Sequence, residues 1–94
     1  YVSTKRFIEL TEALSSSPEA ADIYAIFASL LSAKELQDME NRLEIIHQLH
    51  QGKTQREIAE NLKVGIATVT RGSKAYKAGI FTPLLNCLGK HYEV

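Results

Sequence analysis

Apolar residues recur along this chain every three to four positions, the spacing that gathers side chains on one face of a helix. These stripes predict helices over about 4–14, 18–31, 33–52, 54–62, 65–78 and 82–90. Short polar or glycine-containing connections separate them. Residues 65–73, read alone, suit a short strand because four of them are β-branched, but the helical pattern around them outweighs this. The pattern therefore predicts an all-α fold of six short helices.

Local start and stop signals support these boundaries. In a capping box, an N-cap hydroxyl and a glutamate three residues later satisfy each other's backbone N–H groups, and Ser32–Glu35 and Thr54–Glu57 both have this pattern. The other signals are Ser17 as N-cap with Pro18 at the first helical position, Gly52 and Gly79 as helix ends, and Thr82-Pro83 as a cap of the last helix.

The segment from 18 to 31 is apolar nearly all round. Such a helix is buried, either inside its own domain or against a partner subunit. A chain of 94 residues buries only about two-thirds of its unfolded surface, so a monomer would be marginal. We therefore expect a single domain, 1–94, that forms a homodimer.

Residues 54–77 have the organisation of a DNA-binding helix-turn-helix: a short helix, a tight turn and a second helix that crosses the first. Ala59 is small enough for the crossing. At the turn, Lys63 stands where a positive φ is needed, which strains a residue with a side chain. Apolar residues suited to join the two helices are Ile58, Leu62, Val64, Ile66 and Val69.

Stepping around the second helix at 100° per residue separates three faces. Ile66, Val69, Ser73 and Tyr76 are expected to pack inward; Ala67, Thr70, Lys74 and Lys77 to meet DNA; Arg71 and Ala75, with Thr68 beside them, to point in a third direction. Small side chains near the helix start allow close approach to base edges, and basic ones such as Arg56 contact phosphates. The alternative is a pair of amphipathic helices without any role in DNA binding.

Charge is distributed unevenly although the chain is neutral overall. Residues 1–50 carry four basic and eight acidic side chains, and residues 51–94 carry seven and three, so the two parts have net charges of −4 and +4. This asymmetry is consistent with an acidic scaffold that carries a basic nucleic-acid-binding surface.

Other features argue against a disulfide-bonded, membrane-spanning, secreted or metal-binding protein. Cys87 is the only cysteine, which suits a reducing cytoplasm, and its apolar neighbours predict a packed thiol. No apolar run reaches the roughly 18 residues of a membrane span, and no signal-peptide pattern opens the chain, although it begins with Tyr1 instead of Met. His47 and His50 share a helix face, but no recognisable ligand set accompanies them, so we expect no metal site.

Gln55-Arg56-Glu57 followed by Gly65–Ser73, which reads GIATVTRGS, resembles the tryptophan (trp operon) repressor family. The resemblance covers about 29–77. It implies an intertwined all-α homodimer, with 1–52 and 82–90 as dimerisation helices and 54–77 as the helix-turn-helix. It further implies a cytoplasmic repressor, not an enzyme, that uses L-tryptophan as corepressor and no other cofactor. The repressor would bind a pseudo-palindromic double-stranded operator of tryptophan biosynthesis genes and no membrane.

The same resemblance assigns site residues. Arg42 would stack on the indole and Arg71 would cover its other side and bind the carboxylate, while Ala75 replaces a serine usual in the family. The implied ligand-binding set is Ser29, Leu31, Arg42, Ile45, Ile46, Arg71, Gly72 and Ala75, with the carbonyls of Ser29 and Leu31 supplied by the other subunit. The DNA-binding set is Arg56, Gly65, Ile66, Ala67, Thr68, Thr70, Lys74 and Lys77.

Two other functions stay open from the residues alone. One is a helix-turn-helix regulator of the same fold with a different effector or none. The other is a small enzyme or a protein-interaction module, for which the sequence offers no paired carboxylates, nucleophile–base set or phosphate loop. Arg42 as an ordinary surface arginine also stays open.

Overall fold

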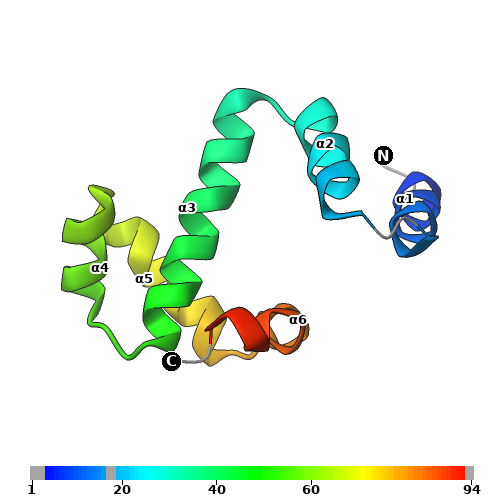
Figure 1. The fold of residues 1–94 in the computed structure, drawn as a ribbon. Helices are drawn as coiled ribbons and strands as arrows, with labels where there is room; N and C mark the ends of the chain where they lie inside the picture. Colours follow the sequence, from blue (N-terminus) through cyan, green and yellow to red (C-terminus); the bar gives the residue numbers. More distant parts are fainter. Residues whose placement is uncertain (1–3, 17–18, 93–94) are drawn as a thin grey trace. The chain divides into compact units, whose positions relative to one another are not determined.

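The structure, a computed structural model, describes residues 4–16 and 19–92, with side chains as far as residue 88. Within these residues the chain forms six α-helices and no β-strand, which confirms the predicted all-α fold (Figure 1). The helices are α1 (Lys5–Ser16), α2 (Ala20–Leu30), α3 (Ala33–His50), α4 (Gln55–Leu62), α5 (Ile66–Lys77) and α6 (Thr82–Tyr92). None of the helices in the described part of the chain combines the length and the apolar character that crossing a membrane requires.

The chain divides into two compact units, Tyr1–Leu36 and Gln37–Val94, with the boundary inside α3. The first unit contains α1, α2 and the start of α3. None of the residues of α1 or α2 is buried in the single chain, and Tyr24 and Leu30 are 67% and 62% exposed. Tyr24 and Leu30 are therefore apolar side chains that α1 and the rest of this unit leave exposed.

The start of α2 differs from the sequence prediction. The helix begins at Ala20, and its N-cap is Glu19, whose side chain makes no capping hydrogen bond. Ser17 and Pro18, which the sequence predicts as N-cap and first helical residue, lie outside the described residues.

Both predicted capping boxes form. At the start of α3, the backbone N–H of Ser32 donates to Glu35 Oε1 over 2.8 Å and that of Glu35 donates to Ser32 Oγ over 3.1 Å. At the start of α4, Thr54 and Glu57 make the same two bonds at 3.1 and 3.2 Å. Hydrogen bonds from the backbone and side chain of Thr54 hold the pKa of Glu57 below its ordinary value.

The core of the second unit lies where α3, α4 and α5 meet. Each helix contributes one buried aliphatic residue to this cluster, Ile45, Ile58 and Val69 respectively, and Ile46 of α3 is buried beside it. The half-buried residues packed around them are Leu49, Ala59, Leu62 and Val64. The small side chain of Ala59 thus lies at the junction of α4 and α5, as the sequence predicts.

A buried polar contact ties α4 to α3 beside this core. Gln48 is buried, and its Oε1 accepts a hydrogen bond from Asn61 Nδ2 over 3.1 Å. Because burying a side-chain amide without a partner is costly, this bond favours one register between the two helices.

A three-residue turn joins α4 to α5, and its first residue, Lys63, has φ 55° and ψ 44°. This is the left-handed conformation that the sequence predicts for this position. It is unfavourable for a residue with a Cβ, because the side chain crowds the following carbonyl.

Replacing Lys63 by glycine is expected to stabilise the protein by about 1 kcal/mol, the net of relieved left-handed strain and glycine's greater chain entropy. A higher urea midpoint at an unchanged slope would be the measured result. Lys63→Ala is the matched control, because it removes the same charged side chain but keeps the Cβ. If Lys63→Ala raised the midpoint as much as Lys63→Gly, the strain would not be the cause.

The last helix differs in detail from the prediction. A Thr82 cap implies that the helix begins at Pro83, but it begins one residue earlier, at Thr82. The carbonyl of Phe81 accepts a hydrogen bond from the N–H of Leu85 over 2.8 Å. The prediction that Cys87 is a packed thiol is wrong, since Cys87 is exposed. Leu84, Leu85 and Leu88 are half-buried, and Cys87 lies at the edge of the face that they share.

Candidate functional site

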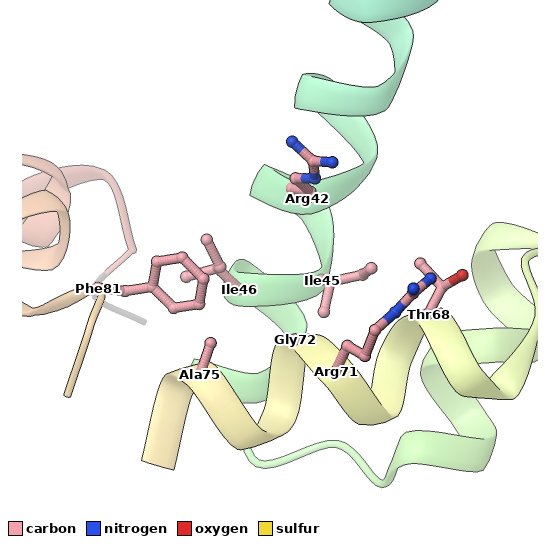
Figure 2. Close-up of a pocket in the computed structure, with 8 residues that line it drawn as sticks. All are labelled: Arg42, Ile45, Ile46, Thr68, Arg71, Gly72, Ala75 and Phe81. Carbon is pink, nitrogen blue, oxygen red and sulfur yellow. The ribbon is translucent and has the colours of Figure 1, made fainter. Parts of the chain in front are cut away.

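A pocket of about 350 Å³ lies between α3 and α5 in the second unit, with the residue before α6 at one end (Figure 2). Three stretches of chain supply its lining. The lining residues are Arg42, Ile45 and Ile46 from α3, Thr68, Arg71, Gly72 and Ala75 from α5, and Phe81.

The lining is cationic and apolar. Arg42 and Arg71 come from different helices, and neither forms a salt bridge within the part of the chain that the structure describes. The aliphatic side chain of Ile45 lies between them, and that of Ile46 lies beside Phe81 (Figure 2). A guanidinium binds a carboxylate through a planar fork and stacks on an aromatic face. The arrangement therefore suits a flat apolar ring that carries a carboxylate.

Gly72 lets α5 lie close to α3 at the bottom of this pocket. A Cβ placed on Gly72 would lie 3.0 Å from Cγ2 of Ile45, closer than side chains tolerate without movement of a neighbour. Ile45 is itself buried in the core. A side chain at position 72 would therefore push against the core residue Ile45, and the glycine permits the close approach of the two helices.

Six of the eight residues that the sequence assigns to ligand binding line this pocket: Arg42, Ile45, Ile46, Arg71, Gly72 and Ala75. The other two, Ser29 and Leu31, belong to the first unit and are not among the lining residues. Ser29 Oγ donates to the carbonyl of Ile26 over 2.7 Å.

Two further residues line the pocket without having been assigned to it. Thr68, which the sequence assigns to DNA binding, is half-buried at the pocket. Phe81 was not predicted to have any role. No helical spacing connects Phe81 to the other residues, because it follows the end of α5 and the turn at Gly79. The one signal in the sequence that could have pointed to Phe81 is that an aromatic residue follows soon after the helix-ending Gly79.

The remaining residues assigned to DNA form an exposed surface on α4 and α5. All of them are exposed: Arg56, Gly65, Ile66, Ala67, Thr70, Lys74 and Lys77. Thr70 Oγ1 donates to Gln55 Oε1 over 2.8 Å, which links this face of α5 to the start of α4. α5 thus presents one face to the pocket and another to solvent.

Of the four residues expected to pack inward from α5, Val69 and Ser73 are buried and Tyr76 is half-buried. The inward prediction for Ile66 is wrong, because its side chain is 52% exposed. Ile66 is the first residue of α5, where Val64 of the preceding turn already packs against the core. Its exposure places an apolar side chain on the same surface as the residues assigned to DNA.

His50, at the end of α3, contacts α5. Its Nδ1 lies 2.9 Å from the hydroxyl of Tyr76, and the two rings meet edge to face. Among the residues the structure describes, no group of three or more His, Cys, Asp or Glu side chains is arranged to hold a metal ion.

Comparison with known protein families assigns the chain to one of them. Residues 5–81 match the family model described as Trp repressor protein. The chain belongs to the Trp repressor family. The family consists of DNA-binding regulators and not of enzymes, so this chain is not an enzyme.

Curated relatives carry a related description, Trp operon repressor homolog. A Trp operon repressor homolog of Chlamydia trachomatis serovar D is 40% identical over 72 residues, which are 76% of this chain and 73% of the relative. Homologs of Vibrio parahaemolyticus and Vibrio cholerae are 32% and 41% identical over 71 and 54 residues. These cover 74% and 56% of this chain and 69% and 52% of the relatives. No solved structure gives a significant match.

Proposed function

We propose that this member of the Trp repressor family binds operator DNA only weakly alone and tightly when L-tryptophan occupies the pocket. The observation that carries the proposal is the double role of α5. Its residues Thr68, Arg71, Gly72 and Ala75 line the pocket, and Ala67, Thr70, Lys74 and Lys77 occupy its exposed surface. A ligand beneath this helix can therefore bias the position from which the helix meets DNA.

Residues of the pocket contact the carboxylate and the indole of L-tryptophan in this proposal. Arg71 binds the carboxylate, and Arg42 stacks on the indole next to the aliphatic side chains of α3. The ammonium has no acceptor from Ala75, and its partners are the backbone carbonyls of Ser29 and Leu31 of a second chain. This division between two chains makes corepressor binding dependent on the dimer.

The exposed surface accounts for DNA binding. The α4–turn–α5 segment acts as a helix-turn-helix, with the start of α5 in the major groove. Gly65, Ile66 and Ala67 are small or apolar residues that approach base edges and thymine methyl groups. Arg56, Lys74 and Lys77 neutralise phosphates, which makes the affinity depend on salt.

A homodimer supplies two copies of this surface for the two halves of a pseudo-palindromic operator. The uncovered apolar side chains of the first unit, which include Tyr24 and Leu30, are available for the subunit interface. Repression of tryptophan biosynthesis genes in the cytoplasm would follow from the binding of such an operator when tryptophan is abundant.

The test is a pair of titrations at one salt concentration. L-tryptophan is titrated calorimetrically into the protein, and a DNA fragment from upstream of tryptophan biosynthesis genes is titrated with and without the amino acid. We expect tryptophan to tighten DNA binding at least tenfold, within the roughly 5–150-fold range of allosteric coupling. The chain contains no tryptophan, so fluorescence of the bound ligand gives an independent signal.

Each negative outcome has a distinct meaning. Salt-dependent DNA binding that ignores tryptophan would indicate a regulator of this fold with another effector or none. Sedimentation that shows a stable monomer would contradict the mechanism of two half-sites.

A further inference from the structure

The pocket has two chemically different ends. Arg71 and Thr68 lie at one end, and the ring of Phe81 lies at the other, beside Ile46 and across from Ala75 (Figure 2). A ligand whose carboxylate is held by Arg71 therefore extends its apolar part toward Phe81.

The backbone fixes the position of Phe81 from both sides. Before it, Gly79 has φ 81° and closes α5, with hydrogen bonds from the N–H of Gly79 to the carbonyl of Tyr76 and from that of Ile80 to the carbonyl of Ala75. These two bonds form a Schellman motif, which reverses the chain over the last turn of the helix. After it, the carbonyl of Phe81 accepts from the first turn of α6. Phe81 is therefore anchored at the pocket and is not part of a loose connection.

The ring of Phe81 limits the pocket at this end, because neither of the neighbouring residues Ala75 and Ile80 does so. Ala75 contributes only a methyl group from α5, so it leaves open space that the ring of Phe81 borders. Phe81 is half-buried, whereas the adjacent Ile80 is 66% exposed and does not line the pocket.

We propose that Phe81 determines which aromatic ligands the pocket accepts. Its ring forms the apolar end wall and contacts the edge of the ligand ring that is farthest from the carboxylate. Aromatic pairs prefer such edge contacts, and they add to the free energy of burial. The wall also limits how far substituents on the ligand ring can extend. This inference rests on the proposed function, because it assumes that tryptophan is the ligand of this pocket.

The experiment compares wild type, Phe81→Ala, Phe81→Leu and Ile80→Ala by calorimetric titration with L-tryptophan and with bromotryptophans substituted on the benzene ring. Phe81→Ala is expected to bind L-tryptophan about tenfold more weakly, in line with the loss of an aromatic contact and its buried area. It is also expected to raise the affinity for bromotryptophan relative to tryptophan severalfold, because space opens beyond the ring. Phe81→Leu should change the affinity for L-tryptophan and the relative affinity for bromotryptophan in the same directions, but by smaller factors.

Ile80→Ala is the matched control, since it removes a neighbouring apolar side chain outside the pocket and should bind both ligands as the wild type does. Thermal unfolding checks each fold, and Phe81→Leu carries the test if Phe81→Ala does not fold. Equal affinities and an equal ligand ranking in the Phe81 variants and Ile80→Ala would overturn this inference and leave the proposed function intact. A wild-type protein that does not bind tryptophan would overturn both.

Discussion

Replacing Arg71 by alanine is expected to abolish the tightening of DNA binding at L-tryptophan concentrations near the wild-type dissociation constant and to change the affinity of the unliganded protein little. Among the pocket-lining residues, Arg71 is the cation that α5 contributes. A charge-assisted hydrogen bond contributes roughly 1.5–3 kcal/mol, so its loss weakens tryptophan binding about tenfold to a hundredfold. Titration of tryptophan and of the operator fragment, each at fixed salt, measures the two effects separately.

Arg56→Ala is the matched control for this variant. Both arginines are exposed, but Arg56 lies on α4 outside the pocket. Its replacement should weaken DNA binding equally with and without tryptophan, lower the salt dependence by about one phosphate contact, and preserve the affinity for tryptophan. Arg71→Lys should recover only part of the response, because an ammonium keeps the charge without the planar fork. Full tryptophan enhancement in Arg71→Ala would exclude this pocket as the corepressor site.

The sequence predicts helix boundaries best where a boundary depends on a few adjacent residues. The capping boxes at Ser32 and Thr54 require only a hydroxyl and a glutamate three residues apart, and both form with two hydrogen bonds each. The positive φ of Lys63 is equally local, because this residue ends α4 and begins the turn itself. These features were predictable since no distant part of the chain takes part in them.

Face assignments along α5 were predictable only where α3 and α4 cover the helix. Val69 and Ser73 lie in the covered middle and are buried, whereas Ile66 lies at the uncovered start and is exposed. A calculation that advances 100° per residue treats every turn as equally covered. The same reasoning explains Cys87, which is exposed because it lies at the edge of the face that its half-buried apolar neighbours share.

Most of the pocket was predicted from the resemblance to the tryptophan repressor family, and the helical period agrees with that assignment. Arg42 and Ile46 are one helical turn apart on α3, and Arg71 and Ala75 are one turn apart on α5, so each pair shares a face. The role of Phe81 could not be read in this way. Its position depends on the chain reversal at Gly79, and the direction of a chain after such a turn depends on packing that the local sequence does not specify.

The second large effect is expected at Gly72, where a valine should destabilise the protein by about 2 kcal/mol and weaken tryptophan binding at least tenfold. Helix propensity alone predicts the opposite sign, because glycine is the poorer helix former by several tenths of a kcal/mol. Packing decides, since even the Cβ would lie 3.0 Å from Cγ2 of Ile45 and valine adds two further methyl groups. Urea unfolding and tryptophan titration measure the two losses.

Gly65→Val makes the same chemical change at the start of the same helix, where a Cβ meets nothing within 4 Å. It should cost well under 1 kcal/mol, mainly through a weaker N-cap, and keep the affinity for tryptophan. Combining Gly72→Val with Ile45→Ala should recover about 1 kcal/mol relative to the sum of the single effects, because the shortened side chain makes room for the valine. Strictly additive effects would show that the two residues do not compete for space, and the close contact between α3 and α5 would then not be what Gly72 provides.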